Sequence, residues 1–217
     1  MSERSLMVET IETKPTLRRR IIEAADALIR EHGLAGATTR KIAKAAGCAE
    51  GSIYVHFADK IDLVIAVVVE REPYFAELLE LPSKAGEGTV DGNLVPWVEE
   101  LVSLIRENQP IFFALMGDRN VFQRFKARIR ERQTGLVAVF NAASAYVRAE
   151  QTLGRIDAGV EPGVVATILI GAARDHTFAP ALTDAAVAPD EGFAWALVHT
   201  VVNGLAPTTP STEEEAS

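Results

Sequence analysis

Apolar residues recur every three or four positions along most of the chain, which predicts helices rather than strands. The first such stripe holds Leu17, Ile21, Ala24, Ala25, Leu28 and Ile29. Thr16 is a good N-cap before it, and Gly33 is a suitable end after it. Val/Ile runs occur near 63–69 and 164–170, but no two-residue hairpin turn with alternating flanks accompanies them. The pattern predicts an all-α fold.

Shorter helical periods follow the first stripe. We expect a helix over 39–46 that is capped by Thr38 and ended by Gly47, and a short helix over 50–56. Asp59 is expected to cap a longer helix that Pro73 ends or kinks. Further helices are predicted at about 94–108, 110–116, 119–132, 134–153, 162–178 and 190–203, with Asp190 capping the last of them and Gly204 ending it.

The loop "PSKAGEGTVDGN", residues 82–93, is rich in Gly and Pro and separates the amino-terminal part from the rest. The sequence therefore predicts two unequal helical domains. The expected division is a flexible arm at 1–13, a first domain at 14–60, a larger domain at 61–205 that begins with a connecting helix at 61–81, and a disordered tail at 206–217.

Composition fits an ordinary globular protein, with 48% hydrophobic and 24% charged residues among 217. The one cysteine, Cys48, excludes an internal disulfide and fits a reducing compartment. Residues 1–14 are polar and mixed in charge, unlike a secretory signal, and the longest apolar run, 163–173, is too short to cross a bilayer. We expect a cytoplasmic protein with no membrane partner.

The charge distribution changes the expectation about partners. A net charge of −8 argues against a polyanion, but residues 14–60 hold nine Lys/Arg and five Asp/Glu, a balance of +4. Residues 61–217 hold twelve against twenty-two, a balance of −10, and residues 1–13 add −2. A basic segment on an acidic body indicates polyanion binding at one end, unless the imbalance has no functional meaning.

Residues 38–57, "TTRKIAKAAGCAEGSIYVHF", have the spacing of two short helices joined by a tight turn. Ala43 is small where the second helix crosses the first, and Gly47 tolerates the positive φ that the turn requires. The apolar positions Ile42, Ala46, Cys48 and Ile53 are spaced to join the two helices. This pattern predicts a helix-turn-helix, whose second helix enters the major groove of DNA.

The same stretch and the residues after it contain Thr38-Thr39-Arg40-Lys41-Ile42-Ala43, Ala46-Gly47, Gly51-Ser52-Ile53-Tyr54, His56-Phe57 and Asp59-Lys60. With these residues it resembles the DNA-binding domain of the TetR family of bacterial transcriptional regulators. The resemblance covers about residues 16–69. It implies a homodimer on a double-stranded DNA operator, a small-molecule effector held inside the helical bundle, and neither cofactor nor metal. Because repression is the commoner mode in the family, a repressor is expected.

The resemblance and the side-chain chemistry together predict the DNA contacts. They are Thr38, Thr39, Arg40, Glu50, Gly51, Ser52, Tyr54, His56 and Lys60. Arg40 has the planar fork that matches guanine O6 and N7, and Tyr54 suits a thymine methyl or a phosphate unless it is core. Residues 18–20 either add phosphate contacts or form a solvated helix face.

Two positions depart from the family pattern. Ala49 replaces the usual Ser cap, which costs about 1 kcal/mol at the start of the helix. Glu50 suits the positive end of the helix dipole and can act as a cap, but it repels phosphate; alternatively, it accepts a hydrogen bond from a cytosine amino group.

The family dimerises through its last two long helices, which are here broadly apolar. The expected interface residues are Val165, Leu169, Ala172, Trp195, Val198 and Val202; ordinary core helices are the alternative. The expected ligand-binding residues are Trp97, Phe113, Met116, Phe140, Asn141, Ser144 and Arg174, with plain core again the alternative for each aromatic. Phe112, Phe122, Phe125 and Tyr146 are further candidates for the lining. The effector is expected to be largely apolar.

Two other classes of function compete. An enzyme is disfavoured because no catalytic or dinucleotide-binding motif appears, and His176 with Asp175 is the one pair to test. A helical interaction protein that has lost DNA binding would fit Glu50 and the acidic total. No residue has metal-ligand spacing around His56.

Overall fold

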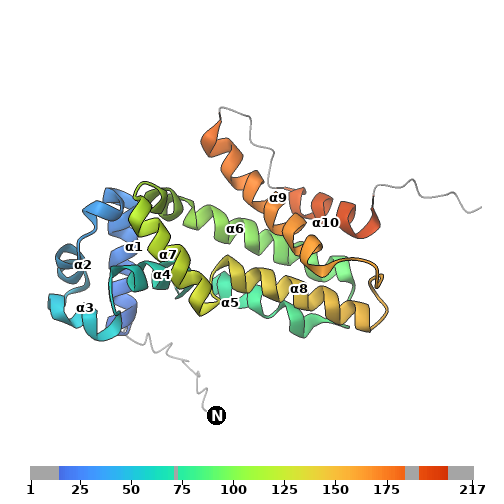
Figure 1. Cartoon of the computed structure of the whole chain (residues 1–217), viewed down its shortest axis with the longest axis horizontal. Helices are drawn as coiled ribbons and strands as arrows, with labels where there is room; N and C mark the ends of the chain where they lie inside the picture. The colour runs from blue at the N-terminus through green and yellow to red at the C-terminus, as the bar shows by residue number, and fades with distance from the viewer. Residues whose placement is uncertain (1–14, 71–72, 184–190, 205–217) are drawn as a thin grey trace, which may run out of the picture. The chain divides into compact units, whose positions relative to one another are not determined.

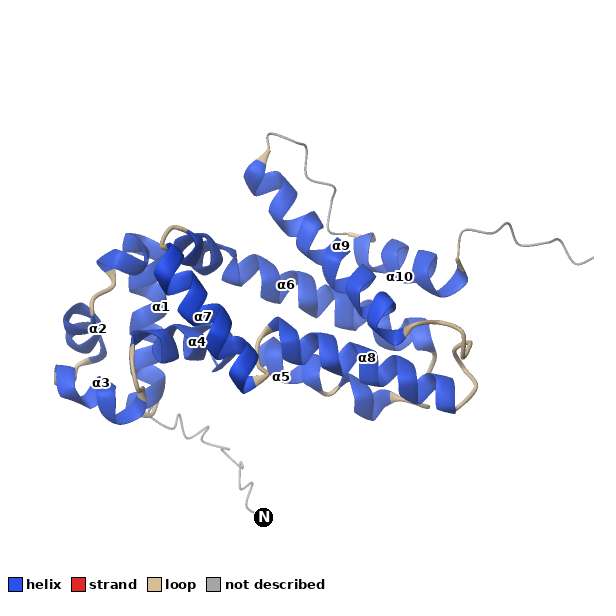
Figure 2. Cartoon of the chain, in the orientation of Figure 1, coloured by secondary structure: helices blue, strands red, loops and turns tan. Residues whose placement is uncertain are grey.

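The computed structural model describes residues 15–70, 73–183 and 191–204, and the regular structure of these residues is entirely helical (Figure 2). The all-α prediction is confirmed. The chain divides into two compact units, which we call the head, ending at Val67, and the body, beginning at Val68. The sequence had suggested a boundary after Lys60; the division instead lies inside one helix.

The head contains three helices and most of a fourth (Figure 1). They are α1 (Leu17–Gly36), α2 (Thr39–Ala46), α3 (Glu50–His56) and α4 (Lys60–Glu70). The predicted N-caps are confirmed: Thr16 Oγ1 accepts from the Arg19 amide at 3.3 Å, and Thr38 Oγ1 accepts from the Lys41 amide at 3.3 Å. Each cap contributes roughly 1 kcal/mol because it satisfies an otherwise unpaired amide.

Gly33 and Asp59 also act as the sequence predicts. Gly33 has φ 69° and breaks the helical geometry of α1 four residues after Ile29, so the last turn continues in another direction. Asp59 Oδ1 accepts from the Asp62 amide at 2.9 Å at the start of α4.

The turn between α2 and α3 depends on Gly47, whose φ of 67° and ψ of 43° lie in the left-handed region. The Cys48 amide donates to the Ala43 carbonyl at 3.0 Å, and the Gly47 amide donates to the Lys44 carbonyl at 3.3 Å. This pair of bonds is a Schellman motif, which satisfies the last carbonyls of α2 and fixes the direction in which α3 departs.

The core of the head joins α1, α2 and α3, which pack on one another. Its most deeply buried members include Ile21, Ala25, Ile42, Ala43, Ile53 and Phe57. Ile53 is 1% exposed and is the one buried residue of α3. The short helix is thus held by a single apolar anchor, together with Phe57 just beyond it.

The body contains the remaining elements. They are α5 (Pro73–Leu79), the 3₁₀ turn η1 (Leu81–Lys84), α6 (Val90–Met116), α7 (Arg119–Arg132), α8 (Leu136–Thr152), α9 (Pro162–Leu182) and α10 (Phe193–Asn203). Helix α9 packs on α6 and α8, and α10 packs mainly on α6 (Figure 1). The core between them includes Trp97, Leu101, Tyr146, Leu169 and Val198.

Helix α6 corrects the sequence prediction of a loop to residue 93 and two helices at 94–108 and 110–116. Thr89 caps the helix by accepting from the Gly92 amide at 3.1 Å, so it begins at Val90. It then continues through Pro110, because Ile111 and Leu115 beyond the proline are at most 1% exposed. Burying two such side chains contributes about 3–6 kcal/mol, which offsets the roughly 3 kcal/mol cost of an internal proline.

Other boundaries differ less. The predicted connecting helix at 61–81 is divided into α4 and α5, and Pro73 is the first residue of α5. Helix α9 continues beyond 178 to Leu182. Helix α10 follows Gly192 and ends before Gly204 as predicted; Asp190, the arm at 1–13 and the tail at 206–217 lie outside the described residues.

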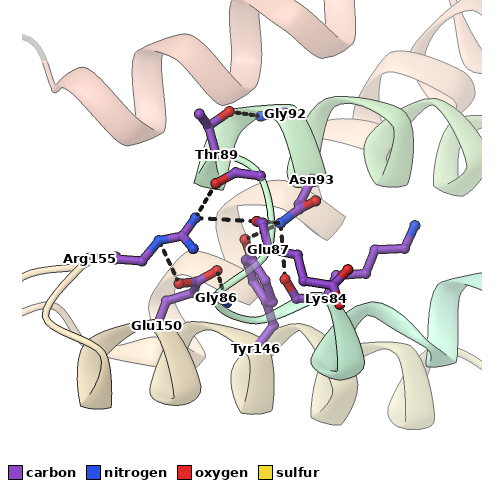
Figure 3. A network of polar contacts seen from close by, with 10 residues as sticks. Lys84, Gly86, Glu87, Thr89, Gly92, Asn93, Tyr146, Glu150 and Arg155 are labelled. Atoms are coloured by element: carbon purple, nitrogen blue, oxygen red, sulfur yellow. Dashed lines mark hydrogen bonds and ion pairs between the residues drawn. The ribbon is translucent and has the colours of Figure 1, made fainter.

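The Gly-rich connection between η1 and α6 is fixed by α8 and the residues after it (Figure 3). Glu150 is fully buried; its Oε1 accepts from the Gly86 amide at 3.3 Å, and its Oε2 lies 3.1 Å from Arg155 Nε. Arg155 Nη2 in turn donates to the Gly88 carbonyl at 2.9 Å. The buried carboxylate is therefore paired, as burial of a charge requires.

Asn93 completes this network. Its Nδ2 donates to the carbonyls of Lys84 at 3.2 Å and Glu87 at 2.9 Å, and to the Tyr146 hydroxyl at 3.2 Å. Burial raises the pKa of Tyr146 to about 12. Glu150 also raises this pKa, whereas the hydrogen bond from Asn93 lowers it by less than burial raises it. The connection between η1 and α6 is thus bound at several backbone groups despite its flexible composition.

Candidate nucleic-acid interface and effector cavity

The outward face of α3 is open in the head. Tyr54 is 55% and Val55 81% exposed, and Glu50 and Gly51 are exposed beside them. Gly51, Tyr54 and Val55 are spaced i, i+3 and i+4, so they share one side of the helix, opposite the buried Ile53. The alternative that Tyr54 belongs to the core is therefore wrong. Val55 was missed by sequence reasoning, although its four-residue spacing from Gly51 indicated the same face.

Helix α2 adds exposed cations. Arg40, Lys41 and Lys44 are all exposed. Among the described residues Arg40 has no ion-pair partner, so its guanidinium is available. Thr38 uses its hydroxyl as the α2 cap.

Glu50 and Thr39 connect the starts of α3 and α2. The Thr39 hydroxyl donates to Glu50 Oε1 at 2.5 Å, and Ala49 makes no side-chain cap. Glu50 thus stands in the first turn of α3, where a carboxylate is favoured by the helix dipole, and part of its hydrogen-bonding capacity is satisfied within the head.

Two cations predicted near DNA have contacts inside the head. The Lys60 ammonium donates to the Leu34 carbonyl, and partial burial lowers its pKa. Arg18 donates from Nη1 to the His56 carbonyl at 2.9 Å, and its guanidinium lies 4.5 Å from the centre of the Phe57 ring. Arg18 therefore joins α1 to the end of α3 and is not simply a solvated residue.

The remaining predicted residues are less distinctive. Ser52 and His56 are half-buried, and the His56 ring meets the edge of Phe57 with centroids 6.3 Å apart. Arg19 pairs with Glu23 at 2.9 Å on the exposed face of α1, and Arg20 is exposed.

The body contains a cavity of about 540 Å³, within the usual range for small-molecule sites. Most of its wall is apolar or aromatic. It is lined by Val68, Phe75, Leu104, Ile105, Asn108, Ile111, Phe112, Leu115, Phe122, Gln123, Phe125, Lys126, Ile129, Arg130, Gly135, Leu136, Val137, Arg174 and Phe178.

Of the seven residues predicted to bind ligand, Arg174 lines this cavity and the other six lie elsewhere. Trp97 is buried and its indole N–H donates to the Leu78 carbonyl at 3.1 Å. Phe113 packs on Phe178, Phe140 packs against the main core, and Met116 is 55% exposed. Asn141 is exposed, whereas Ser144 is buried and its Oγ has no hydrogen-bond partner among the described residues.

Helix α7 supplies much of the lining, of which the sequence suggested only the aromatic Phe122 and Phe125. Phe122, Phe125, Lys126, Ile129 and Arg130 line the cavity at helical spacing. The signal in the sequence was an aromatic and aliphatic stripe inside a strongly basic helix, which resembles an ordinary amphipathic surface helix.

The predicted dimer residues divide into core and surface. Leu169 and Val198 have no exposed area and belong to the chain's own core, and Val165 packs against that core. Trp195 is 58% and Val202 42% exposed, and Ala172 is half-buried. On α9, Val164 is 53% and Ile168 44% exposed. Each directly precedes a predicted interface residue, Val165 and Leu169 respectively.

His176 and Asp175, the pair considered for catalysis, lie in different surroundings. The His176 ring stacks on Phe193 of α10, with centroids 3.8 Å apart and planes inclined by 9°, while Asp175 is exposed. Among the described residues no group of three His, Cys, Asp or Glu side chains is placed to hold a metal ion. No described helix is long and apolar enough to span a membrane.

Residues 21–67, nearly the whole head, match the family model described as bacterial regulatory proteins, tetR family. The head of the chain is therefore similar to the tetR family of bacterial regulatory proteins. The match includes α2, the Gly47 turn and α3, which are the elements that form the exposed face described above.

Individual curated relatives are similar to this chain over about the same region. The HTH-type transcriptional repressor AcnR of Corynebacterium glutamicum is 40% identical over 67 residues, which cover 30% of this chain and 36% of that protein. The aligned region spans about a third of the length of the curated relatives.

Solved structures share the fold over most of the chain. A putative TetR-family transcriptional regulator from Mesorhizobium loti has a TM-score of 0.66 at 18% identity, covering 86% of this chain and 93% of that one. The transcriptional regulator FadR from Bacillus subtilis, in complex with stearoyl-CoA, has a TM-score of 0.62 at 21% identity, covering 86% and 98%. At these identities the likeness concerns the fold.

Proposed function

We propose that the chain is a TetR-family regulator, and specifically a ligand-responsive DNA-binding repressor. It binds a palindromic operator as a homodimer and is released by a small, largely apolar effector. The observation that carries the proposal is the exposed Gly51, Tyr54 and Val55 face of α3, presented by a helix that buries one residue. AcnR, a relative in the head, is named a transcriptional repressor, which supports the same reading.

In this proposal α3 enters the major groove and α2 supports it. Gly51 allows close approach to the DNA, and Tyr54 and Val55 contact thymine methyl groups. Arg40 reads guanine from α2, while Thr38, Thr39, Ser52 and His56 are proposed to contact the backbone. Lys60, whose ammonium already contacts the Leu34 carbonyl, contributes mainly through its charge.

One recognition helix makes too few contacts for a selective genomic site, so the protein is proposed to work as a dimer. The exposed apolar residues of α9 and α10 support this proposal. We place Val164, Ile168, Ala172, Trp195 and Val202 in the interface and assign Leu169 and Val198 to the core beneath it.

Release is proposed to act through α4. Val68 of this helix lines the cavity, and the residues before it belong to the head. An effector that favours one arrangement of α4 would change the separation of the two α3 helices, which must be about 34–36 Å to fit successive major grooves. Acting on DNA implies a cytoplasmic protein, and no catalytic step is proposed.

The direct test is binding to operator DNA selected from genomic fragments. Replacing Arg40 by Ala is expected to weaken binding to the selected site by about 1–3 kcal/mol and binding to random DNA much less, because guanine readout is lost. Fluorescence anisotropy against rising salt measures both, with Arg20→Ala as the exposed control.

Equal losses on both DNAs would move Arg40 to a phosphate role. A flat dependence of affinity on salt would contradict DNA binding through Lys and Arg. Failure to enrich any sequence from the fragments would favour the rival function, a helical interaction protein.

A further inference from the structure

The charges around the cavity are all of one sign. Among the described residues that line it, three are cations, Lys126, Arg130 and Arg174, and none is a carboxylate. The body as a whole is acidic, since residues 68–217 carry twelve Lys/Arg against twenty-one Asp/Glu. A cavity lined by cations alone is therefore the reverse of the surrounding composition.

The three cations come from two helices. Lys126 and Arg130 are spaced i, i+4 on α7, so they lie on one face of it, and Arg174 comes from α9. All three are exposed residues, whereas Ile111 and Leu115 in the same wall are almost fully buried. The cations therefore line the solvent side of the cavity, and its depth is apolar.

These positive charges are not neutralised by the protein. Within the described ranges none of the three cations forms an ion pair with a carboxylate. The Lys126 ammonium lies 5.6 Å from the centre of the Phe122 ring, a contact that leaves its charge in place. A charged group with an aqueous side and no partner is well suited to bind an external anion.

We propose that the cavity binds an amphipathic anion. Its apolar tail would lie among the aromatic and aliphatic residues, and its anionic group would lie at Lys126, Arg130 and Arg174. Carboxylate and phosphate heads share the required chemistry, since a guanidinium binds either through two parallel hydrogen bonds. This inference names the effector class and rests on the proposed function.

Matched probes distinguish the contribution of the ligand's anionic group from that of its apolar tail. Palmitate, palmitoyl-CoA, hexadecanol and hexadecyltrimethylammonium carry the same chain with a carboxylate, a phosphate-bearing head, a neutral head and a cationic head. Titration calorimetry with the full chain, below the micelle concentration of each probe, is expected to give at least tenfold tighter binding of an anion than of hexadecanol. Whichever of palmitate and palmitoyl-CoA binds more tightly shows whether the cavity prefers a carboxylate or a phosphate-bearing group.

Charge-removing variants test the residues. Arg130→Gln and Arg174→Gln are each expected to weaken palmitate or palmitoyl-CoA binding by about tenfold and to leave hexadecanol binding unchanged. Arg119→Gln is the matched control, because this exposed arginine is on α7 and does not line the cavity. Thermal unfolding verifies that each variant is folded.

The proposal is overturned if hexadecanol or the cationic probe binds as tightly as the anions, if coenzyme A without a chain binds equally well, if no probe binds, or if the two glutamine variants behave like Arg119→Gln. Operator binding is measured separately. An anion that binds with the expected charge dependence but leaves operator DNA bound would support this inference and contradict effector-driven release.

Discussion

Glu50 brings a negative charge to the helix that we propose enters DNA. Its carboxylate accepts from Thr39 at 2.5 Å, so it is held at the junction of α2 and α3. A like charge near phosphates weakens binding at low salt, while the same charge benefits the start of α3.

Replacing Glu50 by Gln is therefore expected to increase affinity for DNA about two- to fivefold at low salt, because a repulsive charge is removed and the hydrogen bond from Thr39 can persist. Fluorescence anisotropy measures the change. Glu31→Gln, the same charge change at an exposed site of α1, is the control, and an equal gain in both variants would show that only net charge matters.

Tyr146 makes a pH-dependent contribution to stability. Its folded-state pKa of about 12 lies above the usual value of about 10. Between these values the unfolded chain loses the proton that the folded chain keeps, so the free energy of unfolding falls as pH rises from 10 to 12.

Tyr146→Phe is expected to cost about 0.5–1.5 kcal/mol at pH 8, through the lost bond from Asn93, and to remove this alkaline component. The difference between the two proteins should then shrink from pH 10 to 12 in chemical unfolding curves. A constant difference across that range would show that the tyrosine does not titrate differently in the folded state.

Single residues differ in how far sequence reveals their role. Thr16, Thr38 and Asp59 were predictable caps because a cap depends on a few neighbouring residues. Arg18 and Lys60 were not predictable, since each contacts a carbonyl 38 or 26 residues away. Helical spacing from Gly51 would have predicted that Val55 lies on the exposed face, but Val55 was not selected because its side chain has no hydrogen-bonding group.

At the scale of elements, the head followed its local signals and the body did not. Helix α2 begins after its cap Thr38 and ends at Gly47 as predicted, and α3 has the predicted bounds. Helix α6 continues past Pro110 because Ile111 and Leu115 beyond it are buried, and such tertiary packing is not visible in a local pattern.

The glycines at each side of the α2–α3 turn should respond oppositely to alanine. Gly47→Ala is expected to destabilise the chain by about 1–2 kcal/mol, because a left-handed backbone is costly for an L-residue although its Cβ would meet no atom within 4 Å. Gly51→Ala, inside α3 with equally open surroundings, should stabilise by up to about 1 kcal/mol. Urea unfolding distinguishes them, and a loss of similar size in both would refute the conformational explanation.

At the scale of the whole molecule, the proposed dimer depends on the exposed apolar residues of α9 and α10. Sequence identified both helices as broadly apolar but could not separate positions that face the chain's own core from those that face outward. Adjacent residues such as Ile168 and Leu169 differ from 44% to 0% exposed, a distinction that depends on which way the helix is turned against α6 and α8.

Ile168→Asp is expected to yield a folded monomer with a large loss of affinity for a palindromic operator, because a charge would be buried between two copies. Sedimentation velocity measures the assembly state and circular dichroism verifies the fold. Leu153→Asp, at an exposed apolar site after α8, is the control and should remain dimeric. A monomeric wild-type chain would contradict the proposed assembly.

The connection around Gly86 and Gly88 has the composition of a place where proteases cut and where inserted segments are accepted. Glu150, Arg155 and Asn93 bind its backbone, however, so an insertion there would break several hydrogen bonds, including one to a buried carboxylate. Engineers who wish to add a tag or a reporter within the chain should avoid this stretch, and brief digestion of the native protein should leave it intact.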